Sequence, residues 1–299
     1  MHGGISGQRA ILQVRWGPMV FRKIVLEPGQ VLRVGRDEAT DFPLPHDSLL
    51  GGMHFELAWN GSECRIRDLK TITGTLVGGK PIKEGFVPHG GWIRAGQTDF
   101  SMYFERNTPP REPEHPSPPA LAARHARVLD LLRSQQSPLY AILDAARSER
   151  ILELLHESVE ECQSLYEGPH GAALTDVAPF LVSLHRTDSW LLENLIQEGW
   201  DANWGIYLTS PEPLLKVRRH FRKFLMVEAE GVESRLYFRF YDPRVLGPFL
   251  LTCPPSSRNE FFGEVENFIF GTPSGAVVEK LSLISETQVG QHASPGARE

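Results

Sequence analysis

The chain has 299 residues, enough for two domains of ordinary size, and its 41% hydrophobic content is normal for a protein that buries a core. Its formal net charge of −6 at pH 7 argues against a general binder of nucleic acid or anionic membranes, because such a protein carries a dominant positive field. We therefore expect protein partners, with no nucleic acid and no membrane among them.

The three cysteines, Cys64, Cys162 and Cys253, are far apart and form no Cys-x-x-Cys pair. Neither a disulfide framework nor a zinc site is therefore expected, and we predict a reducing, cytoplasmic environment. The N-terminal stretch MHGGISGQRA lacks the basic start and apolar run of a secretion signal. No segment approaches the roughly 20 apolar residues that span a bilayer.

Residues 1–107 contain short strand-like runs that alternate with turn signals, which is the pattern of an all-β sandwich. In chain order the runs are AILQVRW, FRKIVL, QVLRVG, MHFELAW, ECRIRDL, GTLVGG, WIRAG and FSMYFE. Asn60-Gly61 stands between two of these runs and predicts a tight hairpin turn.

Three segments of this region resemble the signature segments of the forkhead-associated (FHA) domain: VGRDEATDFPL, LLGGMHFEL and RDLKTITGTLVGGKPI. The resemblance covers residues 10–105 and implies a β-sandwich whose loops bind phosphothreonine peptides in the family. Arg36, His54 and Gly74-Thr75 stand where the family has the same residues.

The resemblance places the candidate phosphopeptide site at Arg36, Gly51, Gly52, Thr71 and Thr73. The two glycines replace the family's Ser and Arg, Thr73 replaces its Asn, and Thr71 keeps a hydroxyl. A phosphate dianion needs several charge-assisted donors, so we predict a degenerate site with weak or absent phosphothreonine binding. Two alternatives stay open: glycine amides form a substitute nest, or Arg36 is a surface residue beside an ordinary turn.

Residues 108–119, TPPREPEHPSPP, contain six prolines and predict a semi-rigid polyproline II linker. Residues 120–284 follow as a mixed α/β domain. Apolar residues recur at helical spacing in LAARHARVLDLL, ERILELLHESV, WLLENLIQ and PLLKVRRHFRKFL, whereas PFLVSL, WGIYLT, FLMVEA and RLYFRFY are strand-like. The polar residues 285–299 are predicted to be a disordered tail.

Several segments between residues 138 and 271 together resemble the adaptor/chaperone family of bacterial type VI secretion, which loads toxic effectors onto the spike protein VgrG. They are YAILDAARSERILELL, SLYEG, APFLVSL, WGIYLTSPEPLLKVRRHFRKFLMV and RLYFRFYDPRVLGPFL. The resemblance implies a non-catalytic binding protein that holds an effector, and often the spike's C-terminal extension, before secretion.

The run RLYFRFYDPRVL predicts a strand in which Arg239 lies between aromatic neighbours and which ends at the Asp-Pro pair. Arginine flanked by tyrosines is a composition favoured at protein interfaces, so Arg239, Tyr241, Asp242 and Arg244 are candidate partner-binding residues. The alternative is that Arg239 and Arg244 pair with Asp242 or Asp144 and hold the fold.

The run KVRRHFRK, residues 216–223, predicts an amphipathic helix with a cationic face. Arg218, Arg219 and Arg222 on this face are candidates for binding an acidic segment of a partner. The alternative is an ordinary solvated surface.

No motif indicates catalysis. His-Glu-x-x-His and Gly-x-Ser-x-Gly are absent, and GTLVGGKP lacks the final Ser/Thr of a nucleotide-binding P-loop. We therefore predict no enzyme, no catalytic residue, no metal and no cofactor.

The leading hypothesis is a type VI secretion adaptor/chaperone that helps load an effector onto VgrG, with the degenerate FHA domain as a second docking module for a phosphorylated or unphosphorylated protein. One alternative is a phosphothreonine-dependent signalling module that regulates secretion. Another treats the sandwich as a rigid spacer or a dimerisation surface.

Overall fold

The protein was analysed as a computed structural model, which describes residues 8–16, 19–110, 119–167, 174–185, 189–227, 236–272 and 278–282. The chain forms two compact units. The first comprises Met1–Pro110 together with Leu152–Glu161, and the second comprises Arg111–Ile151 and Cys162–Glu299. The first boundary between the two units, after Pro110, therefore falls inside the proline-rich stretch. The predicted tail and most of the predicted linker lie outside the described residues.

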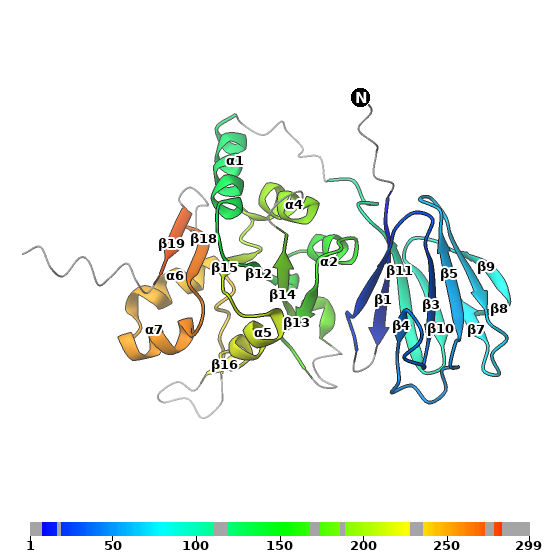
Figure 1. Cartoon of the computed structure of the whole chain (residues 1–299). Coiled ribbons are helices and arrows are strands. Elements are labelled where there is room, and N and C mark those ends of the chain that lie inside the picture. Colours follow the sequence, from blue (N-terminus) through cyan, green and yellow to red (C-terminus); the bar gives the residue numbers. More distant parts are fainter. Residues whose placement is uncertain are drawn as a thin grey trace, which may run out of the picture. The chain divides into compact units, whose positions relative to one another are not determined.

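The N-terminal unit is a β-sandwich, as predicted (Figure 1). One sheet has six strands in the order β2-β1-β11-β10-β7-β8, and the other has five in the order β4-β3-β5-β6-β9. The strands are β1 (Ala10–Trp16), β2 (Lys23–Leu26), β3 (Val31–Gly35), β4 (Phe42–Pro43), β5 (Phe55–Trp59), β6 (Cys64–Asp68), β7 (Thr75–Val77), β8 (Lys80–Ile82), β9 (Glu84–Val87), β10 (Gly91–Ala95) and β11 (Thr98–Phe104). Among the described strands of this unit, β3 pairs with β4 in parallel and all other pairings are antiparallel.

The sandwich core follows from side-chain alternation along the strands. In β5, Phe55, Leu57 and Trp59 are buried, whereas the two residues between them are half-buried. Successive side chains of a strand point to opposite faces, so this pattern turns one face toward the second sheet. Phe55 meets Phe100 of β11 in that second sheet, with ring centroids 5.6 Å apart in an edge-to-face arrangement. Burial of apolar side chains between the sheets therefore holds the sandwich together.

The turn after β5 is longer than the sequence predicted. Trp59 pairs with Cys64, so residues 60–63 form a four-residue loop rather than a two-residue turn. The Asn60 side-chain oxygen accepts hydrogen bonds from the amides of Ser62 and Glu63, at 2.9 and 2.7 Å. Gly61 has a φ of 101°, a conformation that glycine adopts without steric cost. Side-chain capping by Asn60 thus stabilises a wider loop.

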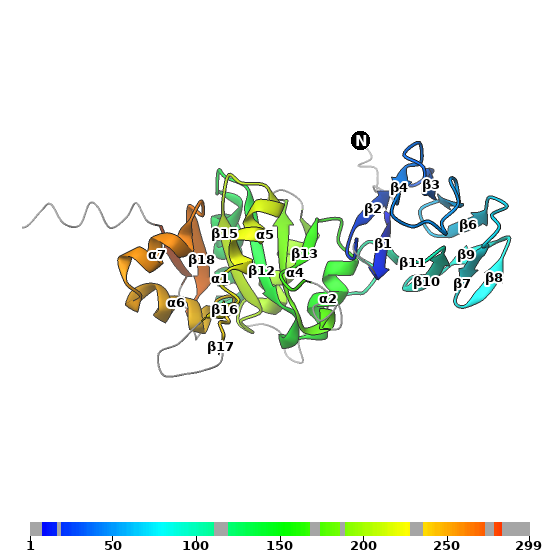
Figure 2. The ribbon, with the colours of Figure 1, turned by 90° about the horizontal axis from the view of Figure 1, so that it is seen from below.

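The second unit is a mixed α/β domain, as predicted, built on a six-stranded antiparallel sheet in the order β13-β14-β12-β15-β18-β19 (Figures 1 and 2). Its strands are β12 (Leu139–Asp144), β13 (Cys162–Ser164), β14 (Pro179–Leu184), β15 (Gly205–Thr209), β18 (Asn267–Gly271) and β19 (Val278–Leu281). Its α-helices are α1 (Pro119–Arg133), α4 (Trp190–Gly199), α5 (Leu214–Arg222), α6 (Pro243–Thr252) and α7 (Pro255–Phe262). Helix α2 (Glu149–His156) begins in this unit, but its residues from Leu152 onward belong to the first unit. Two 3₁₀ turns, Ala145–Arg147 and Thr175–Val177, and a small sheet of β16 (Met226–Val227) with β17 (Leu236–Tyr237) complete the described elements.

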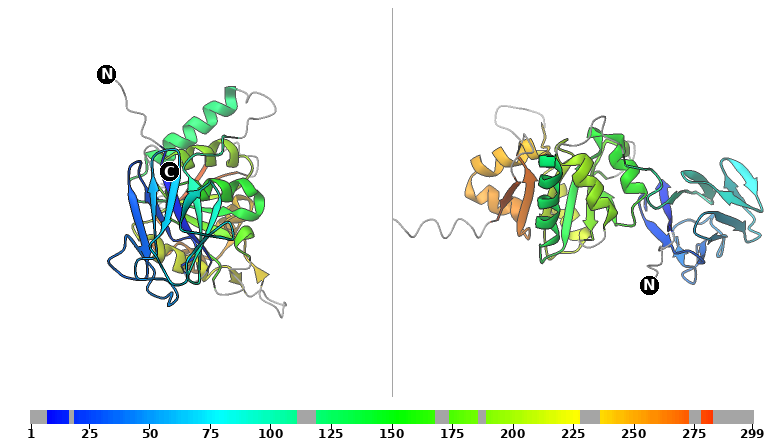
Figure 3. Two further views of the ribbon diagram at one scale, coloured as in Figure 1. Left: turned by 90° about the vertical axis from the view of Figure 1, so that its right-hand side faces the viewer. Right: turned by 90° about the horizontal axis from the view of Figure 1, so that it is seen from above.

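Both faces of this sheet are buried. Ile142 of β12 and Ile206 of β15 lie on one face and pack in a core with α5, α6 and α7, and α6 and α7 lie beside β18 in Figures 1 and 2. The opposite face includes Tyr207, whose ring lies 5.9 Å from Trp200 at the end of α4. Helix α1 contacts α4 and lies at the periphery, as Figure 3 shows. Strand β12 is therefore buried along its whole length, and the uniform burial hides the two-residue period from sequence inspection.

The aromatic-rich run after residue 235 differs from the predicted strand. Only Leu236 and Tyr237 are in a strand, and both are exposed. Tyr241, expected on a face opposite to Phe240, is buried with it, because the chain turns there and enters α6. The Asp242 side chain accepts a hydrogen bond from the Arg244 amide at 3.0 Å and caps α6. N-capping, not strand termination, is thus the local role of the Asp-Pro pair.

Helix α4 begins one residue later than the sequence indicated. In the sequence, Asp188 before SWLLENLIQEG predicts an N-cap and Gly199 predicts a position near the helix end, but Asp188 lies outside the described residues. The Ser189 hydroxyl oxygen accepts a hydrogen bond from the Leu192 amide at 3.0 Å and occupies the capping position. Gly199 is the last helical residue, as expected. None of the described helices is long and apolar enough to cross a membrane.

The phenyl ring of Phe221 in α5 provides a test of the α/β core. It is fully buried and its centroid lies 5.3 Å from that of Phe240 and 5.8 Å from that of Phe261. Phe221→Ala should lower the free energy of unfolding of this unit by about 3–5 kcal/mol, because a cavity replaces these contacts. Urea denaturation followed by circular dichroism measures the loss. Leu215→Ala in the same helix removes an exposed side chain and should change stability by less than about 0.5 kcal/mol; equal losses would contradict the described core.

Candidate functional site

All five predicted phosphopeptide-site residues lie in three loops at one end of the sandwich, residues 36–41, 45–54 and 69–74, which we call the apex loops. The Arg36 amide donates to the Gly51 carbonyl oxygen at 2.9 Å, and the Thr73 hydroxyl donates to the Leu49 carbonyl oxygen at 3.2 Å. A Cβ added to Gly51 would lie 2.9 Å from the Thr71 methyl carbon. The fold thus brings together residues that are up to 37 positions apart in sequence (73 − 36).

A buried histidine connects the apex loops. The amide of Gly51 donates to Nδ1 of His54 at 2.9 Å, so the ring proton is on Nε2. Nε2 in turn donates to the carbonyl oxygen of Gly74 at 3.0 Å. His54 has no solvent exposure, so its polar atoms depend on these partners. The family-like histidine therefore has a structural role that fixes the loops to one another.

The hydroxyl protons of the two site threonines are already used. Thr71 donates through its Oγ1 to Oδ2 of Asp68 at 2.8 Å, and Thr75 donates to the same oxygen at 2.7 Å. Thr73 donates to the Leu49 carbonyl oxygen. A hydroxyl has a single proton to donate, so Thr71 and Thr73 have none left for a phosphate oxygen in this arrangement.

The glycine pair allows a close approach of the loops and of a carboxylate. A Cβ on Gly35 would lie 2.0 Å from the Gly52 carbonyl oxygen, so the backbones are nearly in contact. A Cβ on Gly52 would lie 2.5 Å from Oδ2 of Asp37. The Asp37 carboxylate therefore occupies the space where a side chain at position 52 would begin. The sequence did not single out Asp37 as a site residue, because no local pattern shows where its side chain points.

Arg36 is the one cation among the five predicted residues. Its side chain is exposed, and Nη1 lies 3.5 Å from the Ser48 carbonyl oxygen, at the long limit of a hydrogen bond. One guanidinium beside the Asp37 carboxylate gives a weak cradle for a dianion, since a phosphate is bound strongly where several donors converge.

In the α/β unit, two of the three predicted α5 arginines bind the backbone. Arg218 Nε donates to the Ser164 carbonyl oxygen at 2.7 Å, and Arg222 Nε donates to the Leu165 carbonyl oxygen at 3.1 Å. Arg222 also forms an ion pair with Glu167. Burial is the main cause that lowers the pKa of Arg218. Arg219 is exposed and forms no hydrogen bond or ion pair with the described residues.

The remaining charged residues among the predicted partner-binding set form intramolecular ion pairs, as the alternative interpretation expected. Arg239 pairs with Asp144, and Arg244 pairs with Asp242 through two bonds of 2.9 and 2.6 Å. Both carboxylates are buried, whereas each arginine side chain is 45% exposed. Burial raises the pKa of Asp242, but hydrogen bonds from Arg244 outweigh it and lower that pKa overall. Tyr241 is buried and thus has little surface for a partner.

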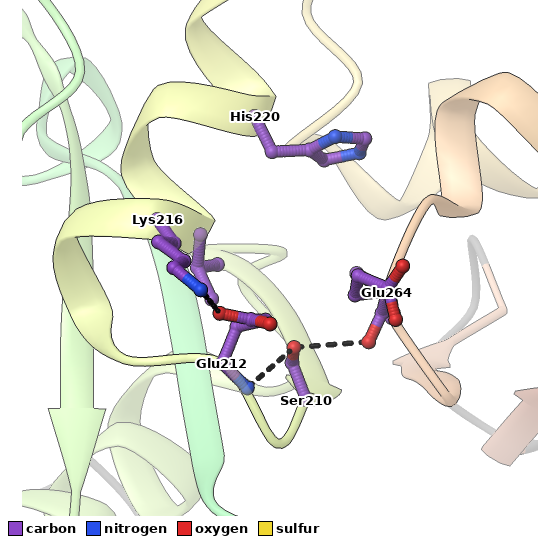
Figure 4. Close-up of a pocket in the computed structure, with 7 residues that line it drawn as sticks. Ser210, Glu212, Lys216, His220 and Glu264 are labelled. Carbon is purple, nitrogen blue, oxygen red and sulfur yellow. Dashed lines mark hydrogen bonds and ion pairs between the residues drawn. The ribbon is translucent and has the colours of Figure 1, made fainter.

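A cavity of about 150 Å³ opens between α5 and the segment before β18 (Figure 4). Four of its polar side chains have partners within the domain, those of Ser210, Glu212, Lys216 and His220. Lys216 pairs with Glu212 at 2.8 Å, and the Ser210 hydroxyl donates to the Glu264 carbonyl oxygen at 3.0 Å. His220 Nε2 lies 2.8 Å from the Phe261 carbonyl oxygen, and burial lowers the pKa of this imidazole. Ser210 and His220 thus bond to backbone groups rather than to each other. Within the described ranges, no three His, Cys, Asp or Glu side chains gather as metal ligands.

Asp68 makes the apex loops sensitive to acid. Burial raises its pKa, but hydrogen bonds from Thr75 and Thr71 outweigh this effect and lower the pKa. A depressed folded-state pKa stabilises the fold above the unfolded value near 4, and this contribution is lost as pH falls through the folded value.

Asp68→Asn should therefore lower the free energy of unfolding at pH 7 by about 1 kcal/mol and flatten its dependence on pH below about 4, since the group is only partly buried. Urea denaturation over a series of pH values measures both effects. Glu63→Gln, at an exposed site of the same unit, should match the parent chain at every pH. An unchanged acid slope in Asp68→Asn would contradict the described network.

Comparisons with known proteins agree with these two units. Residues 32–96 match the family model described as FHA domain, and residues 139–260 match the model described as domain of unknown function DUF4123. The search of curated proteins found no match.

Solved structures of FHA domains are similar to the first unit. One, from a study titled "Structural and functional analysis of phosphothreonine-dependent FHA domain interactions", has 28% identity and a TM-score of 0.30, with 32% of this chain and 95% of that chain covered. The FhaA FHA domain, solved in complex with the intracellular domain of Rv3910, has 29% identity and a TM-score of 0.29, with 31% and 98% covered. The FHA domain of CT664 from Chlamydia trachomatis has 22% identity and a TM-score of 0.30, with 32% and 96% covered.

The sandwich with its apex loops and the α/β unit with its ion-paired arginines therefore correspond to two known domain types. Part of the first unit matches the FHA model, and part of the second unit matches the DUF4123 model.

Proposed function

We propose that this protein is a cytoplasmic type VI secretion adaptor that binds an effector and helps load it onto the VgrG spike. The observation that carries the proposal is the DUF4123 match over residues 139–260, because this domain is associated with effector adaptors. FHA and adaptor-type domains are non-catalytic interaction modules, so binding, not bond chemistry, is the proposed activity. The proposed domain boundaries are 1–107, 120–284 and a linker at 108–119.

The exposed side of α5 supports a protein-binding role for the second domain. Arg218 and Arg222 are held by backbone carbonyls, which fixes the helix and leaves Arg219 directed to solvent. Lys223 and Leu215 are also exposed on or beside this helix. Arginine next to an apolar side chain is a favourable pair of anchors at interfaces. An acidic segment of the effector or spike is therefore the proposed ligand of this surface.

The FHA domain is proposed to dock a second protein. Joining two binding modules in one chain turns the second binding event into an intramolecular one and raises its effective concentration. An adaptor gains from this arrangement because it must hold its cargo while it meets the secretion machinery.

A second candidate function is phosphothreonine-gated regulation of secretion. The observation in its favour is the FHA match itself, since a solved relative is described as binding through phosphothreonine. The occupied Thr71 and Thr73 hydroxyls and the Asp37 carboxylate weigh against it.

The α5 surface can be tested by charge reversal. Arg219→Glu combined with Lys223→Glu should reduce recovery of the effector at least about tenfold, because like charges then face an acidic segment. The measurement is co-purification of the tagged full chain with a spike and a toxin encoded by neighbouring genes. Lys80→Glu, the same type of charge change at an exposed site of the FHA domain, should leave recovery unchanged. Undiminished recovery with the double variant would reject this surface.

Phosphothreonine gating can be tested by titrating phosphorylated and unmodified forms of the same threonine peptides against the full chain. We expect affinities that differ by less than about threefold, because a single exposed guanidinium offers little discrimination. Arg36→Ala should change neither affinity by more than that factor. Strong preference for the phosphorylated form that disappears in Arg36→Ala would instead establish gating.

A further inference from the structure

The apex loops expose three large apolar side chains. Leu49 is 49% exposed, Met53 is 55% exposed and Ile72 is fully exposed. They belong to two loops that the buried His54 and the Thr73–Leu49 hydrogen bond hold together. Apolar side chains presented on an ordered surface are suited to contact with a partner, because binding then costs little ordering of the loops.

An exposed carboxylate lies beside these apolar side chains, in the space where a side chain at position 52 would begin. The Asp37 carboxylate lies against Gly52, is exposed, and forms no hydrogen bond or ion pair with the residues that the structure describes. Glu38 follows it and is exposed as well. Carboxylates at this position repel a phosphate dianion and attract an ammonium or guanidinium group.

Arg36 does not cancel this effect. Its Nη1 lies 3.5 Å from the Ser48 carbonyl oxygen, whereas the Asp37 carboxylate is exposed, so a cationic ligand can reach it from solvent. The absence of a Cβ at position 52 lets the Asp37 carboxylate pack against the Gly52 backbone.

We propose that the apex loops bind an unphosphorylated segment of a partner protein in which a lysine or arginine neighbours an apolar residue. The apolar residue contacts Leu49, Met53 and Ile72, and the cation pairs with Asp37. This inference specifies the ligand of the second docking module and so rests on the proposed function. Asp37 is the residue that sets the preference for charge, and it replaces phosphate recognition with recognition of a basic side chain.

The test uses short peptides that share an apolar centre and differ only in the next residue, which is lysine, glutamine, glutamate or phosphothreonine. Fluorescence anisotropy with the full chain should give the tightest binding for lysine and the weakest for glutamate and phosphothreonine. The affinities of the lysine and glutamate peptides should differ by about fivefold to tenfold, because an exposed ion pair in the first is replaced by a repulsion in the second.

Asp37→Lys should invert this order, so that glutamate and phosphothreonine bind better than lysine. Ile72→Ser should weaken all the peptides by about threefold to tenfold without changing their order, because it removes apolar contact area and no charge. Val31→Ser is the matched control, since Val31 is 55% exposed at the opposite end of β3 from Gly35, and it should change nothing.

Three outcomes would overturn the inference: a preference for phosphothreonine in the parent chain, an order that Asp37→Lys leaves unchanged, or no binding of any peptide at about 1 mM. Co-purification of effector and spike with the Asp37→Lys chain separates this result from the proposed function. If effector and spike are still recovered but the peptides do not bind in the expected order, only the proposed ligand of the apex loops is rejected. Loss of recovery from the parent chain itself rejects the adaptor function.

Discussion

The imidazole of His54 is the interaction on which the geometry of the apex depends. It is fully buried and it uses both ring nitrogens, one as acceptor from Gly51 and one as donor to Gly74. A buried ring with two partners allows one loop arrangement, because any other leaves a polar atom unsatisfied. These bonds hold the loops together although Gly51 and Gly52 stand where the FHA resemblance implies Ser and Arg.

The need to satisfy buried polar groups also explains why most of the arginines predicted to bind a partner instead bind groups of their own domain. Buried carboxylates need a counter-charge, and Asp144 and Asp242 obtain it from Arg239 and Arg244. The carbonyl oxygens that follow β13 need donors, and Arg218 supplies one of them. These arginines neutralise or hydrogen-bond groups of their own domain. Fewer cationic side chains are therefore available to a partner than the number of arginines in the sequence suggests.

The two domains therefore support recognition in different ways. The first domain presents loops with exposed apolar side chains and a carboxylate. The second presents helix α5, in which Arg218 and Arg222 are held by hydrogen bonds to backbone carbonyl oxygens. Both arrangements lower the entropy that must be lost when a partner binds, because the side chains that carry the contact stand on pre-ordered backbone. Both arrangements support the proposed role of the protein, which is to hold other proteins.

The sequence by itself determined the two domain types, most strands of the sandwich and the helices α1, α2, α4 and α5, because alternation and helical spacing are local patterns. It missed β12, whose uniformly buried residues show no alternation, and it read residues 238–241 as strand. It located the five apex residues but not Asp37, whose importance arises from contact with Gly52 across a loop. Only the tertiary structure decided which charges meet, since partners such as Asp144 and Arg239 are 95 residues apart and no local pattern encodes their contact.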